Sequence, residues 1–267
     1  MIRSALMNVM TAAALKAGRG LKRDFGEVEN LQVSIKGPGD FVSAADRKAE
    51  KILHDELARA RPGYGFVMEE SGQIDGTDKS HTWFIDPLDG TTNFLHGLPI
   101  FAISIGLARE DQIVAGLVHN PATGDMFIAQ KGQGAYQNNR RLRVAARRDL
   151  ADCLIGCGIP HLGKANEHPF FAANLATVMA KVSNLRRLGA AALDLCFVAS
   201  GSYDGFWERN LQAWDVAAGI IIVKEAGGFV TDADGGAEML AKGSVCAGNE
   251  AIHRDLLNLI QLDNGSK

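Results

Sequence analysis

Residues 83–94 read WFIDPLDGTTNF, and this stretch decides how the sequence is interpreted. Its apolar start favours a β-strand that ends at Asp86, because Pro87 has no N–H to offer to a neighbouring strand. Asp89 follows three residues after Asp86, and Gly90 with the two threonines after it favours the start of a helix. The stretch therefore predicts a strand, a turn that carries two carboxylates, and a helix.

Two carboxylates at such a junction suit a divalent cation and a phosphate together. Asp86 and Asp89 can converge on one point, and hard cations prefer oxygen ligands. The helix start behind them offers N–H groups and the positive end of the helix dipole, which attract a phosphate. The alternative is an ordinary Asp-Pro turn followed by an aspartate that caps a helix, since both residues are common in turns. From this segment alone the two interpretations carry about equal weight.

Two further segments place carboxylates at the ends of predicted elements. Glu69 and Glu70 follow the short apolar run 65–68. Adjacent side chains of an extended chain point in different directions, so only one of them is expected to join a site directly, and a solvated glutamate pair is the alternative. Asp215 stands at the start of a strongly apolar helix, where it either caps the helix or delivers a ligand from the second half of the chain.

No competing catalytic signature is present. The sequence has no G-x-x-x-x-G-K-[ST] phosphate loop, no G-x-G-x-x-G after a strand, no G-x-S-x-G nucleophile elbow and no H-E-x-x-H. The carboxylate segments are therefore the strongest candidates for chemistry.

The order of predicted elements divides the chain into an α+β half, residues 1–145, and an α/β half, residues 146–267. In the first half, a helix is expected from Ser43 to about Arg61, with Ser43 and Asp46 as its capping box. Apolar runs separated by short turns predict an antiparallel meander over 101–109, 112–119 and 126–130. In the second half, predicted strands at 153–157, 184–188, 203–207, 228–231 and 244–247 alternate with predicted helices at 168–181, 190–200, 214–226 and 250–261.

The composition limits the classes of partner. The chain has 267 residues with 28 Lys and Arg against 31 Asp and Glu, a net charge of -3, whereas domains that bind the nucleic-acid backbone are usually basic. Its four cysteines form no C-x-x-C pair and lie among apolar residues, which favours buried thiols in a reducing compartment. The apolar residues near the N-terminus follow a helical period that is expected to end at Gly18 and Gly20. No run approaches the roughly 18 apolar residues of a membrane helix, so we expect a cytoplasmic protein with no membrane partner.

These segments resemble the inositol monophosphatase family of Mg²⁺-dependent, lithium-sensitive phosphatases, and its bacterial SuhB-like branch most closely. The family patterns D-P-[IL]-D-G-T-[TS]-N and W-D-x-[AG]-A-[GA] are present as residues 86–93 and 214–219. The Glu-Glu-Ser metal motif stands at 69–71, and the pattern D-x-V-[ST]-x-x-D stands at 40–46 after Lys36. The elements fall in family order over nearly the whole chain. The resemblance therefore implies the layered α-β-α-β-α sandwich of the sugar-phosphatase type and a homodimer.

The resemblance also implies the metal ligands. Glu69, Asp86 and the main-chain carbonyl of Leu88 would bind a first, tighter Mg²⁺. Asp86, Asp89 and Asp215 would bind a second.

Catalytic and substrate contacts are implied in the same way. Gly90 and Thr91 would present backbone N–H groups to the phosphate, and Thr91, with Asp46 behind it, would orient and help to deprotonate the attacking water. Glu70 would hold a third, weaker Mg²⁺ or its water shell. The residues expected to contact the rest of the substrate are Glu208 through its carboxylate, Ala191 through its backbone, and Asp89 and Asp215.

One departure from the family pattern weakens the expectation of a strict inositol preference. Residues 158–161 read GIPH where animal members carry a serine that touches the inositol ring. A sister phosphatase acting on fructose 1,6-bisphosphate, histidinol phosphate, NADP or a 3′-phosphoadenosine nucleotide would share the same metal core. SuhB-like relatives also include proteins that associate with RNA polymerase. The run RRLRVAARR at 140–148, with five arginines, either faces such an anionic partner or is a solvated edge with gatekeeping charges.

Overall fold

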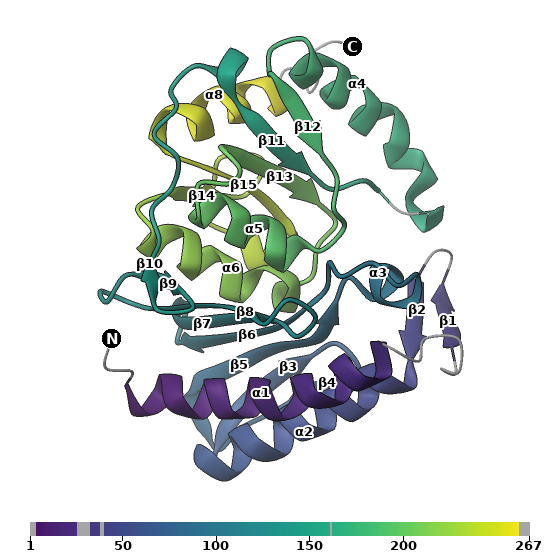
Figure 1. Ribbon diagram of the computed structural model, residues 1–267, viewed down its shortest axis with the longest axis vertical. Helices are drawn as coiled ribbons and strands as arrows, with labels where there is room; N and C mark the ends of the chain where they lie inside the picture. The colour runs from purple at the N-terminus through teal and green to yellow at the C-terminus, as the bar shows by residue number, and fades with distance from the viewer. Residues whose placement is uncertain (1–3, 26–32, 38–39, 161, 262–267) are drawn as a thin grey trace.

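The computed structural model describes residues 4–25, 33–37, 40–160 and 162–261, without the side chains of residues 33–37, 40–43, 162 and 164. Helices and sheets alternate in five stacked layers (Figure 1). The predicted α-β-α-β-α sandwich is therefore confirmed, and solved structures of related proteins share it.

The first layer is a pair of helices, α1 (Ala5–Phe25) and α2 (Ala44–Ala60), which pack on one face of the first sheet. The prediction for α2 is confirmed to within a residue at each end, although its expected Ser43 cap involves a side chain outside the described residues. The expectation that Gly18 and Gly20 end α1 was wrong, because the helix continues through both of them. Gly18 serves packing instead: a Cβ there would lie 3.1 Å from the ring of His119 on the sheet below.

The second layer is a sheet whose described strands run in the order β10-β9-β8-β7-β6-β5-β3-β4. From β5 to β10 each strand pairs antiparallel with the next, which confirms the predicted meander. β3 instead lies parallel to β5, because the chain passes through β4 at the sheet edge before it returns on the other side of β3. The strands are β3 (Tyr64–Met68), β4 (Gly72–Ile74), β5 (Asp78–Asp89), β6 (Ala102–Arg109), β7 (Gln112–Asn120), β8 (Asp125–Gln130), β9 (Ala135–Gln137) and β10 (Arg140–Arg141).

The middle layer consists of α5 (Ala191–Ala199) and α6 (Ala213–Glu225), which contact both sheets. Its buried side chains are almost all apolar, as a helix covered on both sides requires. The second sheet follows in the order β12-β11-β13-β15-β14, with β11 parallel to both neighbours and β15 antiparallel to both of its own. Its strands are β11 (Leu154–Cys157), β12 (Asn184–Arg186), β13 (Gly205–Arg209), β14 (Phe229–Thr231) and β15 (Ser244–Gly248).

The outer layer on the far side is formed by α4 (His168–Met179) and α8 (Glu250–Gln261), as Figure 1 shows. The remaining elements are short: the strand pair β1 (Val33–Gly37) and β2 (Asp40–Ser43), the helices α3 (Thr91–Leu95) and α7 (Met239–Lys242), and 3₁₀ turns at Leu150–Asp152 and Leu162–Glu167. All four cysteines are buried free thiols, as their apolar surroundings predict. Across the described ranges, no helix combines the length and apolar character needed to cross a bilayer.

Candidate functional site

The parallel pairing of β3 and β5 brings two acidic segments side by side. Met68 is the register partner of Ile85, so the next residues along the chain, Glu69 just past β3 and Asp86 on β5, lie side by side. The backbone N–H of Glu69 donates to the carbonyl of Ile85 at 3.3 Å and keeps the two strand ends together. Asp86 is 2% exposed and its Oδ1 accepts from the backbone N–H of Leu88 at 2.8 Å, which holds the carboxylate at the turn.

An irregularity in β5 adds Asp89 to the same place. The pairing of β5 with β6 shifts register between Asp86 and Asp89, and both aspartates stay on the strand on either side of the shift. The expectation that Pro87 ends the ladder was therefore wrong, since Asp89 still pairs with Ala102. The Oδ2 of Asp89 accepts from the backbone N–H of Ala192 at 2.7 Å, in the first turn of α5. A carboxylate at a helix N-terminus is stabilised by the dipole, so this bond ties the turn to the middle layer.

Asp215 reaches the site from the first turn of α6. Ser104 on β6, the register partner of Asp86, donates from its hydroxyl to the carbonyl of Trp214 at 3.1 Å and so places the start of α6 beside that aspartate. Oδ2 of Asp215 accepts from the backbone N–H of Gln212 at 2.7 Å within a capping box. The cap predicted as the alternative role of Asp215 is thus present.

The electrostatics show that these carboxylates form one group. Burial, followed by the charges of Glu69, Asp89 and Asp215, raises the pKa of Asp86 well above its ordinary value. Burial, followed by the charge of Asp215, raises the pKa of Asp89 in the same way, and the N–H of Ala192 offsets only part of the rise. Like charges that share a buried site are unfavourable unless a cation or a proton compensates them.

The donor set fits a hard divalent cation. The four carboxylates offer oxygen, which Mg²⁺ prefers, and a bound cation would relieve the repulsion that raises the pKa of Asp86 and Asp89. Glu69, Asp86 and the carbonyl of Leu88 would hold one ion. Asp86, Asp89 and Asp215 would hold a second. Within the part of the chain that the structure describes, no three Asp, Glu, His or Cys side chains form a closed set of ligands, so these assignments stay predictions.

The turn that carries Glu69 and Glu70 is held by a residue that the sequence analysis did not single out. Glu50 on α2 is 2% exposed. Its carboxylate accepts from the backbone N–H of Glu70 at 2.8 Å and from the hydroxyl of Ser71 at 2.5 Å. The signal available in the sequence was weak, since a glutamate in an amphipathic helix is normally solvated.

The phosphate side of the site contains Gly90, Thr91 and Asp46. Gly90 has φ 86°, and a Cβ there would lie 2.8 Å from the carbonyl oxygen of Ile100, so only glycine fits without strain. The hydroxyl of Thr91 donates to the carbonyl of Leu88 at 2.9 Å. Asp46 is 1% exposed on α2, a helix of the first layer, whereas Thr91 opens α3. Their predicted partnership in activating water stays a prediction.

Asn93 fixes α3 to the loop before α5. Its side-chain amide donates to the carbonyls of Ile100 and Leu188, each at 2.8 Å. This pairing holds the segment that ends in Ala191 against the turn that carries Asp89. The residue belongs to the quoted motif, but its partner lies far along the chain and could not be identified from the sequence.

Glu208 lies at the end of β13, beside the same group of acids. Burial, followed by the charges of Asp194, Asp89 and Asp215, raises its pKa well above the ordinary value, and Arg187 offsets part of this rise. Its carboxylate rests on Gly158, where a Cβ would lie 1.8 Å from Cδ of Glu208. Ala191, at the start of α5, is 5% exposed. The structure thus brings Glu208 close to Asp89 and Asp215, although they come from different elements.

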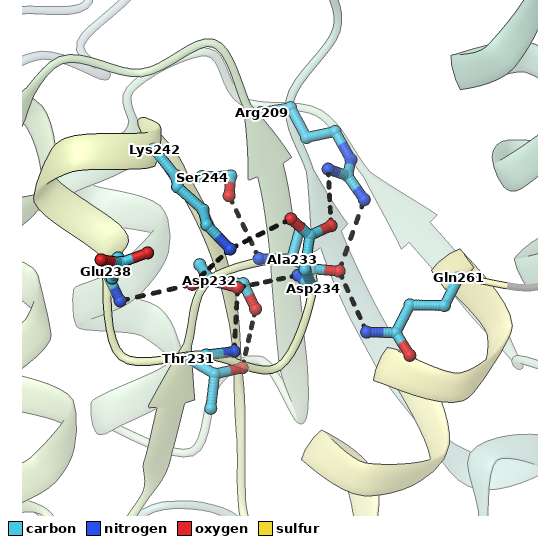
Figure 2. Close-up of polar contacts among 10 residues, drawn as sticks. Arg209, Thr231, Asp232, Ala233, Asp234, Glu238, Lys242, Ser244 and Gln261 are labelled. Atoms are coloured by element: carbon cyan, nitrogen blue, oxygen red, sulfur yellow. Dashed lines mark hydrogen bonds and ion pairs between the residues drawn. The ribbon is translucent and has the colours of Figure 1, made fainter. Parts of the chain in front are cut away.

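The loop after β14 supports the end of β13 (Figure 2). Asp232 is fully buried, and its carboxylate accepts from the N–H groups of Asp234, Gly236 and Glu238 and from Nζ of Lys242. Burial raises its pKa, but these hydrogen bonds outweigh burial and hold the pKa below the ordinary value. The residue after Glu208, Arg209, binds this loop through Asp234 and the carbonyl of Ala233, each at 3.4 Å.

Comparison with known proteins places this site in a family. The sequence pattern of the inositol monophosphatase family matches residues 3–262 of the chain. The inositol-1-monophosphatase of Mesorhizobium japonicum is 61% identical over 261 residues, which cover 98% of this chain and 98% of the relative. A protein of Neisseria meningitidis serogroup B, named putative Nus factor SuhB, is 42% identical over 254 residues, covering 95% of this chain and 97% of the relative.

Among solved structures, the extragenic suppressor protein suhB from Bartonella henselae has a TM-score of 0.94 at 56% identity, covering 98% of this chain and 100% of that chain. A match over nearly the whole length leaves no part of the five-layer fold outside the comparison. The chain therefore belongs to the inositol monophosphatase family, and it is an enzyme, a phosphatase of that family.

Proposed function

We propose that the chain is a Mg²⁺-dependent phosphomonoesterase that hydrolyses inositol-1-phosphate to inositol and phosphate. The observation that carries the proposal is the proximity of four acids, Glu69, Asp86, Asp89 and Asp215, where the charges of neighbouring carboxylates add to burial in raising the pKa of Asp86 and Asp89. When bound, two Mg²⁺ ions, with a third near Glu70, would supply charge neutralisation and a water of lowered pKa. The 61% sequence identity to the protein of Mesorhizobium japonicum that is named inositol-1-monophosphatase supports the choice of substrate.

The chain's own residues then have separable tasks. Gly90 and Thr91 orient the phosphate through their backbone N–H groups. The Thr91 hydroxyl donates to Leu88, so its oxygen remains able to accept a hydrogen bond from the attacking water and to orient it. Asp46 and Glu70 are proposed to receive its proton directly or through water.

The reaction is a single in-line displacement. The water oxygen forms a bond to phosphorus, the bond from phosphorus to the inositol oxygen breaks, and the leaving oxygen takes up a proton. No Cys or His is assigned as a nucleophile, so no phosphoenzyme is proposed. Glu208, with the backbone of Ala191, holds the inositol ring so that its phosphate faces the carboxylates, and Asp89 and Asp215 border it.

Phosphate release tests the proposal. Purified protein is assayed with Mg²⁺ on inositol-1-phosphate, glycerol-2-phosphate, fructose 1,6-bisphosphate and a 3′-phosphoadenosine nucleotide, and then with a chelator and with Li⁺. We expect the highest kcat/KM on inositol-1-phosphate, loss of activity with chelator and inhibition by Li⁺. A higher kcat/KM on the bisphosphate or the nucleotide would favour a sister phosphatase, and full activity in chelator would refute the metal requirement.

A second role is favoured by the relatives named as Nus factors, which suggest association with the transcription machinery. Arg140 and Arg141 are exposed on the edge strand β10, and Arg143 and Arg148 are exposed on the strap that follows it toward the second sheet, whereas Arg147 binds the buried Asp204 at 3.0 Å. We infer that an anionic partner would use this strap. An Asp89→Asn protein that is inactive but still captures RNA polymerase and rescues growth would support this role.

Three further features are part of the proposal. The division into residues 1–145 with the metal and catalytic motifs, and 146–267 with the substrate elements and Asp215, follows the two sheets. A cytoplasmic homodimer is expected from the family resemblance. Sedimentation of the purified protein measures the oligomeric state directly.

A further inference from the structure

A row of polar side chains lies in the interior between α5 and β11, and the proposed mechanism does not use all of it. Asp194 on α5 is 1% exposed and Tyr203, just before β13, is 4% exposed. Asp194 acts on Glu208 through its charge, and Asp194 and Tyr203 interact with each other. Ionisable side chains this deeply buried are rare unless they have partners or a task.

Two glycines create the space for this row: Gly156 on β11, and Gly158 just past its end, whose N–H still donates to the carbonyl of Trp207 at 3.1 Å. A Cβ on Gly156 would lie 2.6 Å from the Tyr203 ring, and a Cβ on Gly158 would lie 1.8 Å from the Glu208 carboxyl carbon. Residues two apart on a strand share one face of the sheet. Tyr203 and Glu208 therefore follow one another along the same side of this segment, and Tyr203 also meets α5 through the ring of Phe197, 5.5 Å away between centroids.

The buried atoms of this row are not paired in an ordinary way. Among the described residues, neither carboxylate oxygen of Asp194 nor the hydroxyl of Tyr203 meets hydrogen-bond geometry with a protein group, although the two side chains interact. Buried polar side chains normally have well-formed hydrogen bonds, so a row of this kind calls for a functional explanation.

The charge on Asp194 acts on Glu208. After burial, Asp194 is the largest of the charges that raise the pKa of Glu208, ahead of Asp89 and Asp215. Arg187, exposed at the mouth of the site, acts in the opposite sense on both acids. Burial raises the pKa of Asp194 itself to about 7, against the opposing effects of Tyr203 and Arg187.

We propose that Asp194 and Tyr203 are positioning residues for substrate recognition, which hold Glu208 in the orientation that receives the hydroxyl groups of a polyol phosphate. This inference rests on the proposed function, because it assigns the pair to the proposed substrate contact of Glu208. Neither residue would touch the substrate. A substrate without hydroxyl groups would be indifferent to the pair.

The experiment compares two substrates on three variants. Asp194→Asn keeps the shape of the side chain but removes its charge, and Tyr203→Phe keeps the ring on Gly156 but removes the hydroxyl. Asp204→Asn is the control, because Asp204 is equally buried, at 2% exposed, yet binds Arg147 and the N–H of Leu154. Each protein is assayed with Mg²⁺ on inositol-1-phosphate and on p-nitrophenyl phosphate, which has no hydroxyl groups.

We expect both Asp194→Asn and Tyr203→Phe to raise KM for inositol-1-phosphate by about tenfold, the scale of lost support for a site residue. The kcat on that substrate and both constants on p-nitrophenyl phosphate should change less than twofold. Asp204→Asn should lower Tm without changing the ratio of the two KM values.

Equal changes on both substrates, or an unchanged KM for inositol-1-phosphate, would overturn the inference. If Asp194→Asn does not fold, Tyr203→Phe decides alone, since it retains the packing of the ring. A wild-type protein that shows no preference for the polyol phosphate would instead contradict the proposed function, and the two failures are thereby distinguished.

Discussion

The contact between Gly158 and Glu208 gives the sharpest test of how substrate is held. Gly158→Ala adds one methyl group at a position whose φ is not in the left-handed region, so the backbone accepts it. The new Cβ would lie 1.8 Å from Cδ of Glu208 and 2.0 Å from its Oε1. The obstacle is the end of a flexible side chain rather than backbone, so the carboxylate must move while the sheet stays in place.

The magnitude follows from the required displacement. Ordinary contact begins at 3.4 Å, so the carboxyl carbon of Glu208 must shift by about 1.6 Å from its position 1.8 Å away. A misplacement of about 1 Å in a site can cost about 100-fold in rate. We therefore expect kcat/KM for inositol-1-phosphate to fall about 100-fold, which corresponds to about 2.7 kcal/mol.

Phosphate release on inositol-1-phosphate and on p-nitrophenyl phosphate measures the effect, and thermal unfolding measures stability. The matched control is Gly20→Ala on α1, where the added methyl group meets nothing within 4 Å. It should leave kinetics unchanged and raise the free energy of unfolding by up to about 1 kcal/mol. If Gly158→Ala retains kcat/KM on inositol-1-phosphate, or loses equally on both substrates, then Glu208 does not hold the polyol.

Four other outcomes are expected. Asp89→Asn should nearly abolish turnover at saturating Mg²⁺ while circular dichroism stays unchanged, because the amide oxygen can still accept from Ala192; near-wild-type kcat would contradict the ligand assignment. Glu50→Gln should lower kcat about 10–100-fold by loosening the turn that its carboxylate holds, and an unchanged kcat would show that this turn needs no such support. In chelator, the Tm of Asp194→Asn minus that of wild type should increase from pH 4 to 7 and then level off. The raised pKa of Asp194, about 7 against 3.8, means that its contribution to stability is present at low pH and lost as pH rises, by at most about 1.4 kcal/mol per pH unit; a flat difference would refute this. Asp232→Asn should lower the free energy of unfolding in urea by about 1–3 kcal/mol at pH 7, and this loss should shrink below pH 4 as the native aspartate also becomes protonated.

The sequence predicted those parts of the molecule that depend on local pattern. The helices of the second half, the meander and the aspartate turn all follow from apolar periodicity and from turn residues near one another in the chain. Two local expectations were wrong: β5 continues past Pro87, and in α1 the preference of glycine for helix ends was overridden at Gly18 by its close packing on His119. Tertiary contact decided that case, and propensity could not.

The supporting residues of the site could not be predicted. Glu50, Ser104 and Asp194 look ordinary in sequence, and each acquires its role from a partner in another layer. Their pairing depends on the order of strands in the sheet, above all on the parallel placement of β3 beside β5. The candidate ligands could be identified without the strand order, because the family resemblance implied which acidic residues come together.

The middle layer has a mechanical consequence. Asp215 is carried by α6, which is clamped between the two sheets, while Glu69 and Asp86 belong to the first sheet alone. A cation bound by both groups would link α6 to the first sheet. Because it would bind only the folded chain, its binding free energy would add to the free energy of unfolding. Resistance of the entire chain to unfolding, rather than the order of one loop, would then rise with the concentration of the ion.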